Sequence, residues 1–138
     1  MSKVAVIYWS GTGNTQAMAV AAADGAKEAG ADVDLLSCAD AGSISAYDAV
    51  ALGCPAMGAE ELEDSEFLPM LERIEPELAG KKVALFGSYG WGDGEWMRSW
   101  ENRCTEKGIS LAAESVLANE APDDAAVAAC RMLGKALA

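Results

Sequence analysis

The strongest indication of the fold comes from the segment of residues 3–15, KVAVIYWSGTGNT. Its first six residues, Lys3–Tyr8, form a short apolar run of strand-forming residues, which is typical of a strand buried on both faces. The glycine-rich turn that follows ends this strand, and a helical pattern extends from about Gly13 to Ala29. A buried strand that leads through such a turn into a helix predicts a βαβ unit of a parallel sheet.

The same alternation continues along the chain. Further strands are expected at 32–36, 49–54, 82–87 and 109–116, and further helices at 65–75, from 93 onward and at 123–137. Asp64 and Asp93 are the expected N-caps of the second and third helices. Right-handed crossovers then favour a three-layer α/β/α sandwich with a five-stranded parallel sheet in the order 2-1-3-4-5, as one domain over residues 1–138.

The composition limits the partners and the kinds of functional site that the chain can have. The chain has 138 residues, of which 51% are hydrophobic and 23% charged, as in a soluble globular protein. Ten Lys and Arg against 22 Asp and Glu give a net charge of −12, which argues against nucleic acid or an anionic membrane as partner. There is no His, so imidazole bases and most zinc or haem sites are excluded. The chemistry must therefore come from a cofactor or from carboxylates and thiols.

The cysteines indicate a reducing compartment. Cys38, Cys54, Cys104 and Cys130 are scattered without CxxC spacing, which argues against zinc, iron–sulfur and dithiol sites. The N-terminus lacks the features of a signal peptide, and no apolar stretch reaches eighteen residues. We expect a cytoplasmic protein with reduced thiols and no metal site.

Glycine, hydroxyl and Trp residues concentrate at the carboxyl ends of the expected strands, in the loops 9–15, 55–60, 88–94 and 119–122. The connectors at the opposite edge are ordinary. Ligands of open α/β sheets bind beyond the carboxyl ends of the strands, so these loops predict the binding site.

The first loop suits a phosphate. It offers hydroxyls, an amide and backbone N–H groups at a helix N-terminus, from Ser10, Gly11, Thr12, Gly13, Asn14 and Thr15. Four or five charge-assisted hydrogen bonds, worth about 1.5–3 kcal/mol each, hold a dianion without a cation. Gln16 stands where a dinucleotide fingerprint has its third Gly, so one phosphate is expected rather than a pyrophosphate. The alternative is an ordinary Gly/Thr turn.

Trp91, on a flexible loop at this edge, suits a lid over a flat aromatic ligand. The alternative is that it packs with Trp96 and Trp100, which we expect in the core because they lie on one helix face with Met97 and Cys104. In the facing loop, Met57 is either a second wall or a core filler.

The carboxylates of Glu60 and Glu120 are either acceptors for ligand N–H groups or solvated side chains.

These loops together resemble those of a flavodoxin. The matching motifs are SGTGNT at 10–15, GCPAMG at 53–58, FGSYGWGDG at 86–94 and Asn119-Glu120, and they cover essentially the whole chain in the right order. The uninterrupted fifth strand is similar to that of the short-chain flavodoxins of fermentative anaerobes. The resemblance implies a non-covalently bound FMN that carries single electrons between redox enzymes, and no catalytic residues.

The resemblance also implies roles for individual residues. The first loop would hold the phosphate, Trp91 and Met57 would cover the two ring faces, and Glu60 would accept from the ring N3–H. The implied FMN-binding residues of the other loops are Pro55, Ala56, Met57, Gly58, Ala59, Glu60, Ser88, Tyr89, Gly90, Trp91, Gly92, Asn119 and Glu120.

Ala59 departs from the family pattern, which more often has Asp, Gly or Asn there. A type II turn across 57–60 in the reduced state requires a positive φ at Ala59, at about 1 kcal/mol. Ala also carries no carboxylate to repel an added electron, so the two effects oppose each other.

From the negative charge of the chain we expect a carrier with a low reduction potential that works as a monomer. A carboxylate ~10 Å from the ring raises the energy of an added electron by ~1.7 kcal/mol at an effective dielectric constant of ~20. The same acidity steers the carrier toward basic patches on partner enzymes. The alternatives are an FMN-dependent NAD(P)H:quinone or flavin reductase, and a receiver domain. The latter needs an Asp where the chain has Cys54-Pro55.

Overall fold

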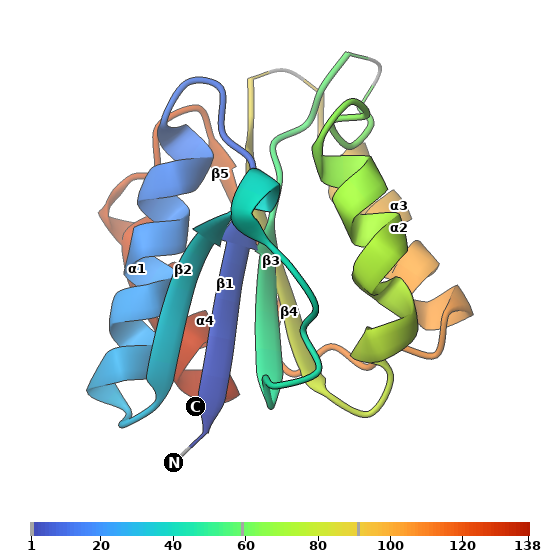
Figure 1. Cartoon of the computed structure of the whole chain (residues 1–138). Helices are drawn as coiled ribbons and strands as arrows, with labels where there is room; N and C mark the ends of the chain where they lie inside the picture. The colour runs from blue at the N-terminus through green and yellow to red at the C-terminus, as the bar shows by residue number, and fades with distance from the viewer. Residues whose placement is uncertain (1, 59, 91) are drawn as a thin grey trace.

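The computed structural model describes residues 2–58, 60–90 and 92–138 of the chain. Five strands alternate with four α-helices in this described part (Figure 1). The strands are β1 (Lys3–Tyr8), β2 (Asp32–Ser37), β3 (Ala49–Gly53), β4 (Lys82–Tyr89) and β5 (Val116–Asn119). The helices are α1 (Asn14–Glu28), α2 (Phe67–Leu78), α3 (Glu95–Glu106) and α4 (Asp124–Leu137), with a short 3-10 helix η1 (Cys38–Asp40) after β2.

The sheet has the expected order β2-β1-β3-β4-β5, and each of its strand pairs is parallel. The register is even: Val4 of β1 lies opposite Val33 of β2 and Ala49 of β3. Strand order therefore reverses between β1 and β3, and the carboxyl ends of these two strands flank the place where ligands of such folds bind.

Two cores cover the two faces of the sheet. Helices α1 and α4 lie on one face, and α2 and α3 lie on the other (Figure 1). Successive residues of a strand point to opposite faces, so Val4 and Val6 of β1 pack toward α1 and α4, whereas Ala5 and Ile7 pack toward α2 and α3. The continuous apolar runs seen in the sequence reflect this double burial.

Two glycines let α1 and α4 approach closely. A Cβ at Gly25 would collide with the carbonyl of Arg131, and a Cβ at Gly134 would collide with the carbonyl of Ala22. None of the helices in residues 2–58, 60–90 and 92–138 is long and apolar enough to cross a membrane.

The expected position of the fifth strand is wrong. Residues 109–115 make one isolated parallel bridge, between Leu111 and Val83, and the strand proper begins only at Val116. The intervening Ala-Ala-Glu-Ser tetrapeptide has weak strand propensity, and bends at Ala112 and Ala113 interrupt the pairing with β4. Asn119 is therefore the last residue of β5 rather than the first of its loop.

Both expected N-caps are also wrong. Helix α2 begins at Phe67, and the carboxylate at its N-terminus belongs to Glu63 rather than Asp64. Helix α3 follows Gly94, whose φ of 91° places it in the left-handed region, so Asp93 lies one residue too early to cap. The expected buried face of α3 is confirmed.

Candidate functional site

Loops from four strands meet at the carboxyl edge of the sheet and enclose a cavity of about 600 Å³. The cavity is lined by Trp9, Gly11, Thr12, Asn14, Thr15, Pro55, Ala56, Met57, Ser88, Tyr89, Gly90, Glu120 and Ala121. Each of the four loops expected to bind a ligand contributes to this lining, so the topology brings the four predicted loops together.

The first loop is shaped by its own hydroxyls. Ser10 Oγ accepts hydrogen bonds from the N–H groups of Gly13 at 3.0 Å and Gln16 at 3.3 Å. These bonds turn the chain into α1, which begins at Asn14 after a left-handed Gly13 with φ 94°. Ser10 therefore shapes the loop from outside the cavity lining.

The turn leaves donors free at the N-terminus of α1. Within the described part of the chain, the backbone N–H groups of Gly11, Thr12 and Thr15 have no hydrogen-bond partner. All three residues line the cavity. Because these N–H groups add to the positive end of the helix dipole, this corner suits an anion without a cationic side chain.

A buried hydroxyl pair joins the first loop to the fourth strand. Thr15 Oγ1 and Ser88 Oγ lie 2.9 Å apart and share a hydrogen bond, and the two residues are 1% and 4% exposed. Thr15 thus directs its hydroxyl toward Ser88, while its backbone N–H stays free.

The loop after β3 is a short hairpin. Met57 and Glu61 exchange two backbone hydrogen bonds of 2.8 and 2.9 Å, and Gly58 and Glu60 at the tip have positive φ angles of 50° and 56°. Ala59, with the turn expected there, lies outside the described residues. Met57 is 37% exposed and lines the cavity, so a large apolar side chain is held half-open at the site.

Glu60 carries a buried acceptor without a donor. Its Oε1 is inaccessible to solvent and has no hydrogen-bond partner in the described structure. The carboxylate lies directly against Gly92, where a Cβ would collide with it. An unpaired buried carboxylate oxygen is costly. The arrangement therefore fits a ligand that donates an N–H at this position, as the N3–H of a flavin ring does.

The aromatic residues around the fourth loop separate into cavity and core. Tyr89 lines the cavity and lies 5.5 Å from Trp96, ring centre to ring centre. Trp96 itself is 1% exposed and donates from Nε1 to the carbonyl of Cys54 at 3.1 Å. Trp100 is also buried, so the core interpretation of these two residues is confirmed. Trp91 lies outside the described residues.

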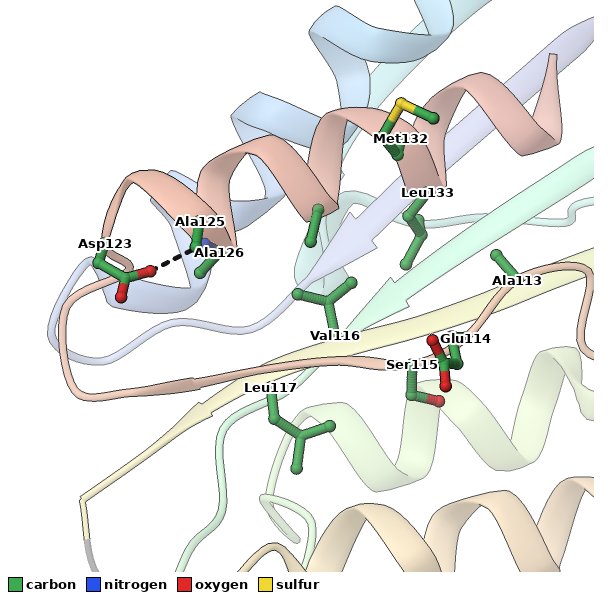
Figure 2. Close-up of a pocket in the computed structure, with 11 residues that line it drawn as sticks. Ala113, Glu114, Ser115, Val116, Leu117, Asp123, Ala125, Ala126, Met132 and Leu133 are labelled. Carbon is green, nitrogen blue, oxygen red and sulfur yellow. Dashed lines mark hydrogen bonds between the residues drawn. The ribbon is translucent and has the colours of Figure 1, made fainter.

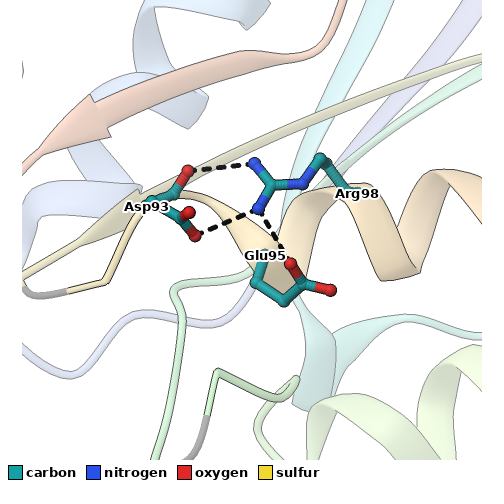
Figure 3. Close-up of polar contacts among 3 residues, drawn as sticks. All are labelled: Asp93, Glu95 and Arg98. Carbon is teal, nitrogen blue, oxygen red and sulfur yellow. Dashed lines mark hydrogen bonds and ion pairs between the residues drawn. The ribbon is translucent and has the colours of Figure 1, made fainter.

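Arg98 forms ion pairs at the start of α3, beside the loop that follows β4 (Figure 3). Its guanidinium donates to the Asp93 carbonyl at 3.1 Å, to Asp93 Oδ1 at 3.0 Å and to Glu95 Oε2 at 2.8 Å. These contacts occupy the guanidinium, so the phosphate corner at α1 receives no cation from it.

The loop after β5 is held to β4. The backbone N–H of Glu120 donates to the Tyr89 carbonyl at 2.7 Å, and Glu120 adopts a positive φ of 58°. The exposed Glu120 lines the cavity, whereas Asn119 ends the strand opposite Tyr89 without lining it.

Glu60 lines a different pocket, together with Trp96 and Trp100. The expected site residues that do not line the cavity are Ser10, Gly13, Gly58, Glu60, Gly92 and Asn119.

Trp9 and Ala121 also line the cavity. They lie in the predicted loops 9–15 and 119–122 but are not among the residues expected to contact a ligand. The sequence position of Trp9 could have indicated its role, because Trp9 directly precedes the glycine turn at the end of the first strand. Its ring packs against Gly11, where a Cβ would lie 3.1 Å from the indole.

A second cavity of about 630 Å³ lies elsewhere, between β5 and α4. Figure 2 shows Val116 and Leu133 among the side chains that line this space. Its lining is mostly alanine and aliphatic side chains, with one Glu and one Asp, and it contains none of the motif residues. The slightly larger volume therefore does not make it the functional site.

An open α/β sheet with an uncharged anion corner and an adjoining half-apolar cavity defines a mononucleotide-binding protein of the doubly wound class. The flavodoxin family model matches residues 6–134. The flavodoxin of Megasphaera elsdenii is 47% identical over 137 residues, which cover 98% of each chain. The flavodoxin of Clostridium beijerinckii is 47% identical over 122 residues, 87% of this chain and 88% of that protein.

Solved structures agree. The solution structure of two-electron reduced Megasphaera elsdenii flavodoxin superimposes with a TM-score of 0.89 at 47% identity, over 97% of each chain. The crystal structure of oxidised flavodoxin 1 from Bacillus cereus has a TM-score of 0.84 at 27% identity, over 99% of this chain and 97% of that one.

The chain belongs to the flavodoxin family. It is accordingly an FMN-binding electron carrier and not an enzyme, and the reductase alternative is not favoured.

Proposed function

We propose that the cavity at the carboxyl edge holds FMN with its phosphate in the first loop. The free N–H groups of Gly11, Thr12 and Thr15 would donate to the phosphate oxygens, with Asn14 alongside. Ser10 and Gly13 would act through the shape of the loop, since the Ser10 hydroxyl is already bonded to the backbone.

The ring would lie between the 55–60 and 88–92 loops. Met57, Tyr89 and Gly90 line this part of the cavity, and Trp91 is proposed from the sequence as the cover of the outer face. The observation that carries the placement is the buried, unpaired Oε1 of Glu60, which would accept the ring N3–H. When bound, FMN accepts and releases single electrons, while these residues orient it and limit its contact with water.

Charge around the site would set its potential and its partners. The loops and first helical turns of the carboxyl edge carry one cation, Arg98, and many carboxylates, among them Glu60, Glu61, Asp93 and Glu120. Such an edge disfavours an added electron and so lowers the reduction potential. It would also direct the carrier to basic docking patches on redox enzymes.

The carrier would work as a monomer in the cytoplasm. A net charge of −12 on each copy opposes self-association. The four buried cysteines are unpaired, as expected in a reducing compartment.

FMN titration tests the site. Quenching of FMN fluorescence by the apo-protein should report tight one-to-one binding. Glu60→Gln should raise the Kd about tenfold, because a neutral amide oxygen is a weaker acceptor than the carboxylate. The neighbouring Glu61→Gln is the matched control and should leave the Kd within about twofold. Equal effects of the two substitutions would remove Glu60 from the site, and failure of the wild-type protein to bind FMN would refute the placement altogether.

A further inference from the structure

Glu63 lies at the junction between the 55–62 loop and helix α2. It is only 5% exposed, which is unusual for a carboxylate, and it is one of the few buried charged residues of the described chain. A buried carboxylate must be compensated by hydrogen bonds or charges, so its partners show what it does.

The Glu63 carboxylate closes the N-terminus of α2. Its Oε1 accepts from the backbone N–H groups of Glu66 at 2.8 Å and Phe67 at 2.7 Å. Its Oε2 accepts from the Ser65 N–H at 3.0 Å and from the Ser65 hydroxyl. The Phe67 N–H belongs to the first turn of α2, and Ser65 and Glu66 lie in the turn that leads into it. Backbone N–H groups at a helix N-terminus otherwise lack partners, and the helix dipole favours a negative charge there.

The charge state of Glu63 follows from these contacts. Burial alone would raise the pKa of the carboxyl, but the hydrogen bonds from the Ser65 hydroxyl and from three backbone N–H groups outweigh it and hold the pKa below its usual value. Glu63 is therefore ionised at neutral pH.

The backbone of Glu63 closes the base of the loop. Its N–H donates to Cys54 Sγ at 3.4 Å, and its carbonyl accepts from the Leu68 N–H at 3.0 Å. Burial raises the pKa of Cys54 to about 12, so its sulfur is a neutral thiol and a weak acceptor. Since Cys54 directly precedes Pro55, the two ends of the 55–62 loop are joined here.

The helix side of this junction is packed into the core. Phe67, the first residue of α2, is fully buried and meets Trp100 of α3 edge-on, with ring centres 5.5 Å apart. Glu63 thus fixes the loop to a packed part of the core, while the Met57–Glu61 hydrogen bonds fix the hairpin above it.

We infer that Glu63 is a positioning residue for FMN, acting through the 55–62 loop without touching the cofactor. The inference rests on the proposed placement of the ring against Met57 and Glu60. The carboxylate that caps α2 comes from the residue that ends the loop. The position of the loop therefore depends on the hydrogen bonds at the N-terminus of the helix.

The test compares Glu63→Gln with Asp64→Asn, which removes a carboxylate one residue further on. Among the described residues, Asp64 makes no hydrogen bond or ion pair. Loss of one negative charge reduces the repulsion of the anionic phosphate, so Asp64→Asn should leave the Kd unchanged or lower it. Glu63→Gln should raise the Kd about tenfold, because the amide nitrogen cannot accept from Ser65 and the loop is released. An unchanged or lowered Kd in Glu63→Gln would overturn the inference.

A stability control separates positioning from general weakening of α2. Leu78→Ala creates a cavity at the other end of the helix. It should lower the urea midpoint of the apo-protein at least as much as Glu63→Gln does. Its Kd for FMN and both of its reduction potentials should equal those of the wild type within error. The reduction potentials of Glu63→Gln are measured at saturating FMN. If the substitution weakens the binding of one redox state of FMN threefold more than that of the next, the potential that joins the two states shifts by about 28 mV. If Leu78→Ala raises the Kd and shifts the potential as much as Glu63→Gln, the role is merely structural.

A milder variant covers the case in which Glu63→Gln does not fold. Ser65→Ala removes only the hydroxyl donor to Glu63 and should raise the Kd about threefold. No change in this variant would count against the inference. Loss of FMN binding by the wild-type protein would instead refute the proposed function.

Discussion

The hydroxyl pair Thr15–Ser88 shows how single residues join parts of the site that lie far apart in the sequence. Ser88 belongs to β4 and Thr15 to the first turn of α1, 73 positions apart, and both are almost fully buried. Because a buried hydroxyl without a partner is destabilising, each residue depends on the other. The pair holds the anion corner of α1 against the edge of the ring cavity.

Replacing Thr15 with Val tests this dependence. The substitution keeps the shape but leaves the Ser88 hydroxyl unpaired, so the apo-protein should lose about 1–2 kcal/mol of unfolding free energy in urea. Thr12→Val is the control, because Thr12 is exposed and its hydroxyl makes only a 3.5 Å contact with the Asn14 N–H. It should change stability by less than about 0.5 kcal/mol. Equal losses of unfolding free energy in Thr15→Val and Thr12→Val would show that the Thr15–Ser88 hydrogen bond does not stabilise the protein.

At the scale of elements, an ion pair joins α2 to α3. Arg103 donates from Nε to Glu75 Oε2 at 2.6 Å and from Nη2 to Oε1 at 2.7 Å. The Glu75 side chain is only 6% exposed, against 29% for Arg103. Such a two-pronged contact with a buried carboxylate costs desolvation, and its removal from one side leaves a charge that water cannot reach.

Arg103→Met should therefore destabilise the protein by about 3 kcal/mol, since it leaves Glu75 buried and uncompensated. Adding Glu75→Met should recover most of that loss, because two apolar side chains replace the pair. Arg98→Met serves as reference: its ion pairs with Asp93 and Glu95 are more than half exposed and should be worth at most about 1 kcal/mol. Urea denaturation of the apo-proteins measures all three. A loss in Arg103→Met no larger than in Arg98→Met would contradict the argument.

The sequence predicts elements well where the pattern is local. The strands β1, β3 and β4 are continuous apolar runs, β2 has the alternating pattern expected of an edge strand, and the order of the sheet follows from crossover handedness. These expectations are confirmed. The strand β5 was placed too early, because Ile109 and Leu111 are apolar for another reason: they pack under the end of α3 and beside Val83. Apolar spacing alone does not separate a strand from a covered connector.

Capping was the other failure, and its cause is also physical. A cap is usually the residue next to the helix, which favours Asp64 and Asp93. The longer Glu63 side chain reaches from further back, and Arg98 takes the Asp93 carboxylate for an ion pair. The same limit applies to the site. Glycines and hydroxyls of the loops can be recognised in the sequence, whereas the roles of Trp9 and Glu63 depend on contacts that form only in the folded chain.

At the scale of the whole molecule, charge is distributed unevenly along the strand direction. Lys3, Lys27, Lys81, Lys82, Lys107 and Lys135 lie at or near the amino-terminal edge of the sheet, by their positions at strand starts and helix ends. The carboxyl edge, where the cavity lies, has Arg98 and an excess of carboxylates. The chain therefore has a dipole that turns its cofactor edge toward a positive partner, which raises the rate of productive encounters rather than the strength of the complex.

The dipole predicts that position matters more than net charge in electron transfer. Glu61→Gln with Asp64→Asn removes two charges from the cofactor edge, whereas Asp32→Asn with Glu114→Gln removes two near the opposite edge, so both pairs change the net charge equally. The reduced edge variant should react with cytochrome c, a basic acceptor, several-fold more slowly at 10 mM salt, where screening extends over ~30 Å. The distal variant should stay within about 1.5-fold of the wild type. At 1 M salt the screening length falls to ~3 Å and the three rates should converge. Stopped-flow rates that fall equally for both pairs at low salt would show that the total charge, and not its orientation, steers the carrier.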